Sequence, residues 1–374
     1  MEILINSKRI TDEFMELVSI DSVSFRERKM ADCLVRKLKE MGFEVYEDSA
    51  GRAFGSDTGN IYGFLKGTIP GQPLLFSAHM DTVEPGIEKK PVLHGDGTIE
   101  SSGDTVLGAD DVAGIVEILE GIRSVKEAGV QYGDIEVLFP IAEEVYIKGT
   151  GNFDFSTIKS KEAYVFDLSG SVGTAAISAP SLVSFKISVR GRAAHAGFDP
   201  EHGINAVAAA CLAVSQIDQG RLDDETTCNI GLISGGAGIN IVPDTCVCIG
   251  EVRSFNHKKA VLQVEKIKSV FEKTAAGFNA EIHAEISVNM EAYKIDRSSH
   301  IVERFLKACG ALELEGQLVS TFGGSDNNNL VKNGIEGIVL SCGMFNVHSR
   351  KEYTLVRELE KGTRLVAELI TSQV

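Results

Sequence analysis

Acidic and histidine side chains of this 374-residue sequence recur at the ends of short apolar runs, where metal ligands and acid–base groups are commonly presented. His79 and Asp81 follow the apolar run 74–78, and their spacing of two directs both side chains to the same face of a strand. A carboxylate beside a histidine fixes the ring tautomer and raises its basicity, which suits a metal ligand. Taken alone, such a pair is more often structural than ligating.

Two adjacent aspartates, Asp110 and Asp111, stand between a glycine-containing loop and the predicted start of a helix. Aspartate is a favoured N-cap residue, so one of the two could simply cap this helix. Two carboxylates in succession also favour binding of a cation. The residue types leave both interpretations open.

Carboxylates also follow two further predicted strands. Glu143 and Glu144 come after the run 135–141, and Asp167 comes after the run 163–166. Open α/β folds build their sites beyond the carboxyl ends of their strands, so we expect these groups at one edge of a sheet. A solvated acidic loop would explain any one of them taken separately.

A late histidine, His348, completes the set. It follows the apolar strand predicted near Ile338 and precedes the last predicted helix. A lone loop histidine is more often a bystander than a ligand. Two histidines and several carboxylates, each at a strand end, nevertheless supply the five ligands of a dinuclear zinc centre in which one carboxylate bridges. One shared site is a simpler explanation than five separate coincidences.

The elements that must position these residues are predicted from hydrophobic periodicity. Helical spacing indicates two helices between Ile10 and Met41, with a break at Ser22 and Ser24. Short apolar runs indicate strands that alternate with further helices, and this alternation predicts an α/β sheet. These elements are strands 60–65, 74–78, 135–141 and 337–341 and helices 111–128 and 356–370.

A different pattern occupies residues 181–289. Its elements follow in the order βαββαβ, which is typical of a ferredoxin-like α+β sandwich. The predicted strands are 183–189, 227–233, 245–252 and 280–288, and the predicted helices are 204–217 and 258–275. Because the α/β pattern resumes afterwards, we predict that the sandwich is an inserted domain, residues 180–292, within a larger domain formed by residues 1–179 and 293–374.

Composition excludes several functional classes. The formal net charge is −16 and no dense lysine or arginine run occurs, so nucleic acid is not expected as a partner. The N-terminal segment carries charges among its apolar positions, and no stretch approaches the roughly 18 apolar residues of a membrane span, so neither a signal peptide nor membrane contact is expected. Seven scattered cysteines fit reduced thiols, and we therefore expect a cytoplasmic protein.

In combination, the segments H-M-D-T, G-A-D-D-x-A-G, E-E, F-D and the late histidine resemble the motif set of the M20 metallopeptidases, and the G-A-D-D block especially resembles peptidase T. The resemblance covers nearly the whole chain in order and spacing. It implies a zinc-exopeptidase-type catalytic domain with a mixed central sheet flanked by helices. It also implies that the inserted sandwich is a lid or dimerisation domain.

The resemblance further implies a role for each residue of the set. One metal would be held by His79, Asp110 and Asp167, and the other by Asp110, Glu144 and His348. Asp110 would therefore bridge two zinc ions per subunit, which cobalt or manganese could replace in vitro. Glu143 would act as the general base and Asp81 would assist catalysis by orienting His79. A cis peptide bond would join Asp110 to Asp111.

Three polar residues of the inserted domain also match the family pattern: His195 in G-R-A-A-H-A-G, Asn240 in G-A-G-I-N-I-V-P-D and Arg253 in E-V-R-S-F. The resemblance implies that His195 reaches the tetrahedral oxyanion and that Arg253, with Asn240, holds a substrate carboxylate. The G-G-S-D-N-N-N segment, with Gly324 and Ser325, occupies the place of a substrate loop in the family. A tight turn with Asx hydrogen bonds is the alternative.

We therefore expect a metal-dependent exopeptidase that releases the N-terminal residue from short peptides, in particular tripeptides. Val112 follows the aspartate pair where the family often carries lysine or glutamate, and the chain is shorter than typical peptidase T, which leaves the peptide length open. The same metal centre would serve a dipeptidase or an N-acyl amino acid deacylase. A non-catalytic metal-binding protein is disfavoured because Glu143 and every ligand are present. The resemblance leaves open a homodimer formed through the sandwich domain.

Overall fold

The computed structural model describes residues 3–372, and the chain divides into two compact units. Unit 1 comprises the residues up to Ser178, Lys294–Thr321 and the residues from Ser325 onward. Unit 2 comprises Ala179–Tyr293 together with Phe322–Gly324. The inserted domain predicted at residues 180–292 differs from the main segment of unit 2 by one residue at each end. The short segment Phe322–Gly324 was not predicted as part of it.

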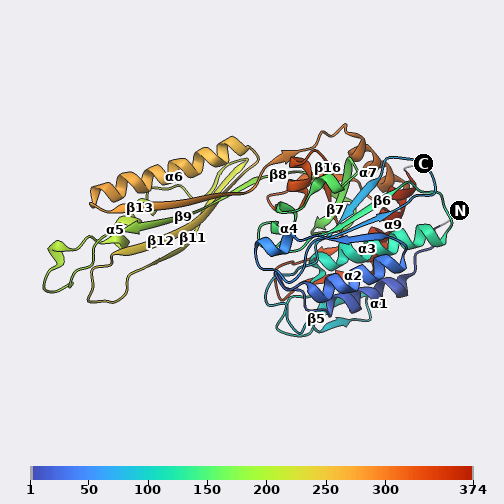
Figure 1. The fold of residues 1–374 in the computed structure, drawn as a ribbon, viewed down its shortest axis with the longest axis horizontal. Helices are drawn as coiled ribbons and strands as arrows, with labels where there is room; N and C mark the ends of the chain where they lie inside the picture. The colour runs from blue at the N-terminus through green and yellow to red at the C-terminus, as the bar shows by residue number, and fades with distance from the viewer. Residues whose placement is uncertain (1–2, 373–374) are drawn as a thin grey trace. The chain divides into compact units, whose positions relative to one another are not determined.

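A mixed nine-stranded sheet forms the centre of unit 1, in the order β1-β2-β6-β3-β7-β16-β8-β14, with β15 beside β8 (Figure 1). Its strands are β1 (Glu44–Glu47), β2 (Ile61–Leu65), β3 (Leu74–Ser77), β6 (Ile135–Phe139), β7 (Glu162–Leu168), β8 (Thr174–Ala179), β14 (Tyr293–Lys294), β15 (Gln317–Ser320) and β16 (Glu336–Ser341). The neighbouring strands β6, β3, β7 and β16 run parallel, so their carboxyl ends lie along one edge. The predicted mixed α/β sheet is confirmed.

Both faces of this sheet are covered because its central strands are apolar on both sides. Leu75, Val165 and Val339 pack with Leu330 of a short helix on one face. The helices of unit 1 are α1 (Ser7–Val18), α2 (Arg28–Glu40), α3 (Ala109–Glu127), α4 (Lys148–Gly151), α7 (His300–Ala311), α8 (Asn327–Lys332) and α9 (Val356–Thr371), with 3₁₀ turns at Ala50–Ala53 and Phe155–Thr157. Of these, α1, α3 and α9 pack against one another (Figure 1). The full burial of Ile115, Ile118 and Leu119 shows how deeply α3 lies in the core.

The segment between α1 and α2 lies beside the end of β3. The N–H of Thr82 donates to the carbonyl oxygen of Ser22 at 3.0 Å, and Val23 forms a parallel bridge with Thr82. The predicted break at Ser22 and Ser24 is therefore confirmed, and the fold places it next to the residues that follow β3.

A second sheet in unit 1 has four strands in the order β17-β18-β5-β4. They are β4 (Pro91–Leu93), β5 (Thr98–Ser101), β17 (Met344–Phe345) and β18 (Tyr353–Leu355). The sequence did not predict this sheet, because strands of two to four residues are too short to show an alternating pattern. Its antiparallel pair β18–β5 brings the segment after β16 next to the segment before α3.

Unit 2 is a sheet covered by two helices. Its strands are β9 (Ser181–Arg190), β10 (Gly220–Asp223), β11 (Thr226–Gly235), β12 (Thr245–Ser254) and β13 (Glu281–Met290), and its helices are α5 (Ala206–Val214) and α6 (His257–Gly277), with a 3₁₀ turn at Pro200–His202. The order β10-β11-β12-β9-β13 contains the predicted ferredoxin-like arrangement, with β10 added at an edge. Phe185 and Val252 of the sheet pack with Ala209 of α5 and Phe271 of α6 in its core.

Membrane-spanning character is missing from the described helices. Across residues 3–372, none of them has both the length and the apolar character that crossing a membrane requires.

Candidate metal centre

The parallel strands of unit 1 bring the predicted site residues to one edge of the sheet. His79 and Asp81 follow β3, Glu143 and Glu144 follow β6, and Asp167 is the penultimate residue of β7. The other two arrive by different routes: Asp110 lies at the start of α3, and His348 lies between β17 and β18. The fold thus gathers residues that are up to 269 positions apart, from His79 to His348.

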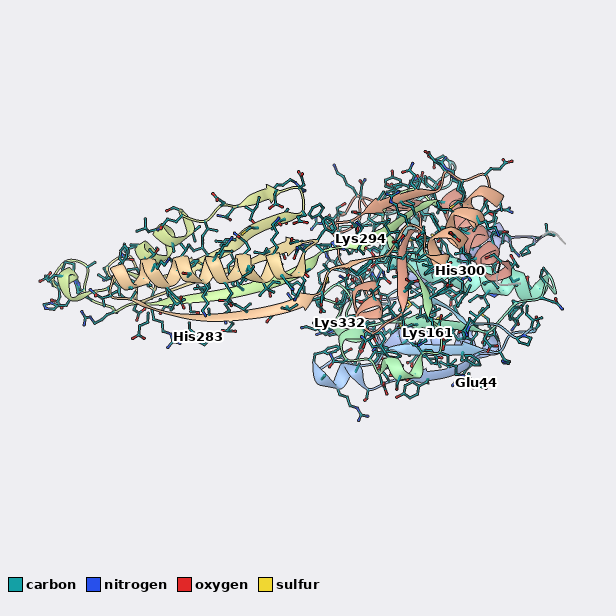
Figure 2. All side chains as sticks on the ribbon, turned by 90° about the horizontal axis from the view of Figure 1, so that it is seen from above. Glu44, Lys161, His283, Lys294, His300 and Lys332 are labelled. Atoms are coloured by element: carbon teal, nitrogen blue, oxygen red, sulfur yellow. The ribbon has the colours of Figure 1, made fainter. Side chains whose placement is uncertain are left out.

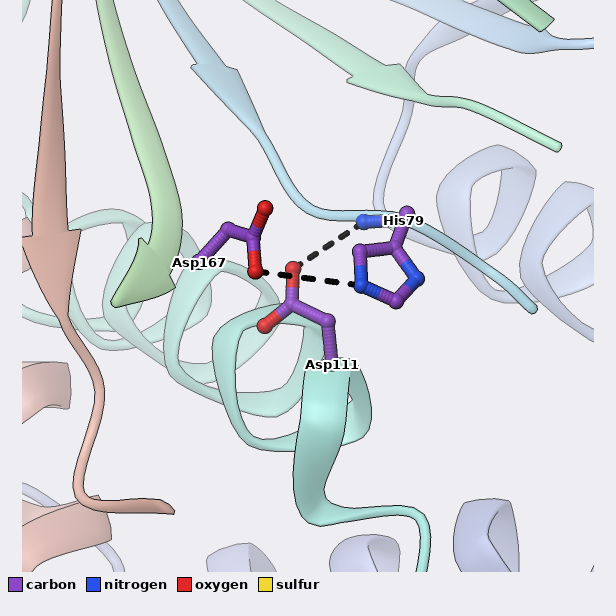
Figure 3. Close-up of side chains that lie close together, drawn as sticks. All are labelled: His79, Asp111 and Asp167. Carbon is purple, nitrogen blue, oxygen red and sulfur yellow. Dashed lines mark hydrogen bonds and ion pairs between the residues drawn. The ribbon is translucent and has the colours of Figure 1, made fainter. Parts of the chain in front are cut away.

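Asp110 occupies the centre of this cluster. Its Oδ1 lies 3.1 Å from Nε2 of His79, and its Oδ2 lies 3.2 Å from Nε2 of His348. Nε2 of His79 also lies 3.8 Å from Oδ1 of Asp167, as Figure 3 shows, and Nε2 of His348 lies 3.0 Å from Glu144. One carboxylate oxygen of Asp110 therefore faces each histidine, which is the arrangement of a bridging ligand.

These separations fit a metal centre. The ligand atoms of a tetrahedral zinc ion, with bonds of about 2.0–2.1 Å, lie about 3.3 Å from one another. The contacts between the nitrogen and oxygen atoms of the cluster run from 3.0 to 3.8 Å. One nitrogen and several carboxylate oxygens on each side of Asp110 are also donors that divalent transition metals prefer. The residues present could thus hold two metal ions with Asp110 between them.

The ring of His79 is held in the orientation that a ligand needs. Its Nδ1 lies 2.9 Å from the backbone carbonyl oxygen of Asp81, which can only accept, so Nδ1 carries a proton and Nε2 is the ring atom that faces Asp110 and could bind a metal. The carboxylate of Asp81 is farther away, with Oδ1 at 3.5 Å. The backbone carbonyl and the carboxylate of Asp81 thus both lie beside Nδ1 of His79, and the orienting role of Asp81 stays a prediction.

The carboxylate of Asp81 also holds the turn after β6. Its Oδ1 accepts from the N–H of Glu143 at 2.9 Å, and its Oδ2 accepts from the N–H of Glu144 at 3.2 Å. Oδ2 also accepts from the hydroxyl of Ser24 at 2.6 Å. The carboxylate of Asp81 thus joins this turn to the segment between α1 and α2.

Asp110 and Asp111 are joined by a cis peptide bond, as the family resemblance implied. Both aspartates have non-helical dihedral angles, as an N-cap residue also does, but neither carboxylate accepts a hydrogen bond from an amide of α3 among the described residues. Asp111 Oδ2 accepts from the N–H of His79 at 3.0 Å (Figure 3), and its Oδ1 lies 3.7 Å from Sγ of Cys342. Asp111 belongs to a possible donor group with His79 and Asp167, but both of its oxygens are engaged by protein donors. Asp110 is the better ligand.

The site concentrates negative charge. Burial, followed by the nearby carboxylates, raises the pKa of Glu143 and that of Asp167 well above the ordinary range. Burial also acts to raise the pKa of Asp110, but hydrogen bonds with the two histidines outweigh it and lower that pKa. Hydrogen bonds, first with Asp110, raise the pKa of His348 to about 11. Across residues 3–372, no lysine or arginine forms an ion pair with these carboxylates, so a bound cation would complete the charge balance.

The two adjacent glutamates after β6 differ in their contacts. Glu144 is engaged with His348, whereas the carboxylate of Glu143 makes no hydrogen bond to any of the described residues. Glu143 is nevertheless buried, with 7% of its surface exposed. It is therefore the carboxylate that is free to accept a proton.

A histidine–carboxylate pair at the opposite edge of the sheet differs from the cluster. His300 of α7, which Figure 2 labels, has its Nδ1 2.8 Å from Glu162, the first residue of β7. Arg304 pairs with the same carboxylate, and the His300 side chain is 69% exposed. The positive charge of Arg304 therefore already neutralises Glu162, whereas no arginine among the described residues pairs with the carboxylates of the cluster.

Sequence reasoning missed several buried acids that support the cluster. Glu352 accepts from the N–H of Asp110 at 2.9 Å and from the N–H of Gly108 at 2.7 Å, and burial raises its pKa to about 7. Glu27 accepts from the N–H of Ala142 at 3.0 Å. Both glutamates lie in charged stretches of sequence, R-K-E and R-E-R-K, that resemble solvated loops. No sequence signal marks them, because their partners are backbone amides.

The G-G-S-D-N-N-N segment forms a hydrogen-bonded turn that begins α8. The N–H of Ser325 donates to Oδ1 of Asn328 at 3.1 Å, and the N–H of Asn327 donates to the hydroxyl of Ser325 at 3.3 Å. Asp326 is buried and accepts from the hydroxyl of Thr150 at 2.5 Å. The alternative of an Asx-bonded turn thus describes the local structure, and a substrate role for Gly324 and Ser325 stays a prediction.

The predicted lid residues of unit 2 fall into two places. His195 and Asn240 lie on paired loops, where the N–H of Ala196 donates to the carbonyl oxygen of Asn240 at 3.0 Å. These loops precede β12, whereas Arg253 lies near the end of that 10-residue strand, and a strand of that length spans roughly 30 Å. Arg253 itself donates to Glu251 and to the carbonyl oxygen of Phe322. Within one chain β12 therefore separates Asn240 from Arg253, and their joint contact with a substrate carboxylate stays a prediction.

Comparison with known proteins agrees with this architecture. The family model described as the M20 peptidase dimerisation domain matches residues 177–279, and the model of peptidase family M28 matches residues 60–187. The uncharacterized protein YqjE of Bacillus subtilis is 36% identical over 98% of this chain and 99% of its own. Peptidase T of Clostridium botulinum is 26% identical over 94% of this chain and 86% of its own.

Two solved structures are similar over the whole chain. A tripeptidase from Staphylococcus aureus has a TM-score of 0.95 and 31% identity, and aminopeptidase PepT from Bacillus cereus has a TM-score of 0.91 and 36% identity. Each comparison covers 99% of both chains. With its two-unit fold and its cluster of histidines and carboxylates, the chain belongs to the M20 peptidase family. Within that family it is peptidase T-like, and it is a hydrolase of the peptidase class.

Proposed function

We propose that this protein is a metal-dependent aminopeptidase that releases the N-terminal residue from short peptides, in particular tripeptides. The observation that carries the proposal is Asp110 with one oxygen toward each histidine, beside the unengaged carboxylate of Glu143. The whole-chain similarity to a tripeptidase and to an aminopeptidase supports the substrate class.

His79 and Asp167 would hold one metal ion, Glu144 and His348 the other, and Asp110 both. Bound there, the two ions would lower the pKa of a water molecule and polarise the scissile carbonyl group.

Glu143 would accept the proton of the attacking water and deliver it to the nitrogen of the leaving peptide. Burial, which raises the pKa of Glu143, makes it a stronger proton acceptor than an ordinary glutamate. Glu144 is poorly suited to this step because its oxygens face His348.

Zinc is the metal that we propose, because imidazole nitrogen and carboxylate oxygen in a closely spaced set suit it, and cobalt or manganese would be accepted by the same donors. Elemental analysis of protein purified without added metal tests this proposal and should find two equivalents per chain. The cytoplasm is the compartment that we propose, supported by seven cysteines that are all free thiols.

His195 would stabilise the oxyanion. Its Nδ1 accepts from the N–H groups of Gly197 and Phe198, each at 3.1 Å, so the proton of the neutral ring lies on Nε2. Nε2–H is then a donor of fixed orientation, as an oxyanion contact requires. Arg253 would hold the substrate carboxylate with its planar guanidinium group.

A homodimer formed through unit 2 would reconcile the two locations of the lid residues. If His195 and Arg253 contact one short peptide, roughly 30 Å of β12 cannot separate them, so one must come from a second copy. The match to a dimerisation domain supports this proposal. So does the second half of β11, where β10 no longer pairs and the side chains of Leu232 and Ile233 are 64% and 51% exposed.

The test is a panel of free and N-acetylated dipeptides, tripeptides and tetrapeptides, incubated with metal-loaded protein and with a chelated sample. We expect loss of the N-terminal residue from free-amine tripeptides, abolished by chelation. Cleavage of the acetylated substrates instead would make the protein a deacylase, and no cleavage with metal present would refute catalysis. Sedimentation of the same sample would report the dimer.

A further inference from the structure

The turn after β6 is held by an unusual set of acceptors. Three successive amides point at two buried carboxylates: the N–H of Ala142 donates to Glu27, and those of Glu143 and Glu144 donate to Asp81. Ala142 has a φ of 51°, a left-handed conformation that a non-glycine residue keeps only when its surroundings impose it. The position of this turn therefore depends on both acceptors.

Glu27 is built into this contact and does not serve α2. It stands at the N-cap position of α2, yet its side chain makes no capping hydrogen bond. It is 0% exposed, its Oε1 also accepts from the N–H of Phe25 at 2.9 Å, and its Oε2 accepts from the hydroxyl of Ser56 at 3.1 Å. Across residues 3–372, no lysine or arginine pairs with it. A carboxyl group is costly to bury without a counter-ion, so helix capping does not account for Glu27.

The same segment contacts the second acceptor. Ser24 donates its hydroxyl to Oδ2 of Asp81 at 2.6 Å, and Val23 is bridged to Thr82. The segment of residues 24–27 thus supplies one of the two carboxylates that hold the turn and contacts the other. They reach it from the N-terminal break between α1 and α2, which is remote in sequence from the ligands.

We propose that Glu27 is a positioning residue for the general base Glu143, acting through the amide of Ala142, with Ser24 supporting Asp81 in the same task. The inference rests on the proposed function, because it concerns the base of that reaction. The Glu143 carboxylate has no hydrogen bond to fix it among the described residues, so its place is set by its backbone. A displacement of about 1 Å at a reacting group can cost roughly a hundredfold in rate.

Two substitutions of Glu27 by side chains of similar length distinguish the loss of hydrogen-bond acceptors from a change in side-chain size. E27M removes both acceptor oxygens, whereas E27Q keeps one oxygen for the amides of Ala142 and Phe25 and lets Ser56 accept from its new N–H₂ group. We expect kcat of E27M to fall roughly 10–100-fold with KM and bound metal unchanged. E27Q should recover most of that loss.

Glu136 offers a matched control on the same strand. It is 0% exposed and accepts from the N–H groups of Lys159 at 2.9 Å and Ser160 at 2.7 Å, but it lies toward the amino end of β6, away from Glu143. E136M should reduce stability and leave kcat unchanged. Hydrogen exchange should show faster exchange of the Ala142 amide in E27M and not in E136M.

Each outcome decides the inference. Wild-type kcat in E27M, a kcat loss in E136M as large as that in E27M, or an E27Q as impaired as E27M would overturn it. If E27M does not fold, S24A is the smaller lesion, and unchanged kcat together with unchanged exchange of the Glu143 and Glu144 amides would overturn the role of the segment. If the wild type cleaves no peptide, the proposed function fails, and exchange of the Ala142 amide still decides whether Glu27 holds the turn.

Discussion

The metal cluster of unit 1 and the lid residues of unit 2 are built in different ways. Around the cluster, buried carboxylates accept from the backbone amides of three ligands: Glu352 from Asp110, Asp111 from His79 and Asp81 from Glu144. In unit 2, His195 and Asn240 are exposed and are held by their own loops. The difference teaches that one chain supplies every residue of the cluster, whereas the proposed roles of the lid residues would require a second copy.

Asp110 provides the largest test of this contrast, because both halves of the cluster meet on it. D110N keeps the shape of the side chain but removes the charge. We expect bound metal to be lost and peptide cleavage to fall by more than about a thousandfold, since metals supply several kcal/mol of transition-state stabilisation and each ~1.4 kcal/mol is a factor of ten. The measurement is metal content with kcat/KM, and D104N, at a side chain 96% exposed, is the control. Metal retention in D110N would break the assignment of the bridge.

The pair Glu143 and Glu144 tests the division of labour within the cluster. E143Q should lower kcat by roughly 10²–10⁴-fold, the usual contribution of a general base, while bound metal stays at the wild-type level. E144Q should lower bound metal as well, because Glu144 faces His348. Steady-state kinetics and elemental analysis of both variants check this. Hydrolysis at the wild-type rate in E143Q would remove the general base from the proposal.

The lid residues call for a test across two chains. H195A should lose roughly 10²–10³-fold in kcat, the cost of one oxyanion donor, and R253A should raise KM through loss of a carboxylate contact. If His195 comes from the partner, mixed dimers of the two variants contain one intact site.

Co-expression should therefore restore about a quarter of the wild-type activity at low substrate concentration, given symmetric dimers that mix freely. Activity no higher than that of either variant alone would mean that the partner does not supply His195.

The site residues that could be predicted have one property in common. Their side-chain type and their position at the end of a predicted strand both indicate a ligand. His79, Glu144 and Asp167 each follow or lie at the end of an apolar strand, and parallel strands must place such residues at one edge. The βαββαβ order was also predictable, because each of its helices and strands is long enough to show its hydrophobic periodicity.

The unpredictable part consists of contacts to the backbone and of distances across a sheet. Glu27 and Glu352 act on amides, and every residue has an amide, so no pattern of residue types identifies the partner. The spacing of His79 and Asp81 likewise does not show that the backbone carbonyl of Asp81 lies nearer to the ring than its carboxylate does. The separation of Asn240 from Arg253 follows from the extended path of β12, which the family motifs do not encode.

The smallest expected effect concerns pH, and it sharpens the contrast between buried and exposed groups. Burial, with the charge of Asp81 added, raises the pKa of Glu27 to about 7. The unfolded chain, with an ordinary glutamate pKa of about 4.3, therefore loses this proton first as pH rises. The free energy of unfolding should fall between about pH 4.5 and pH 7 and level off above, by an amount on the order of 3 kcal/mol from this group.

E27Q cannot titrate and keeps one acceptor oxygen, so its stability should fall less over the same interval. Urea denaturation of metal-free wild type and E27Q at about pH 5 and about pH 7.5 measures the difference, with other titrating groups common to both proteins. If the free energy of unfolding depended equally on pH in the two proteins, folding would not raise the pKa of Glu27. Its side chain would then be ionised in the folded protein at about pH 5 as well. The amide of Ala142 would then be held by a carboxylate throughout, and charge, rather than acceptance alone, would be what E27Q removes.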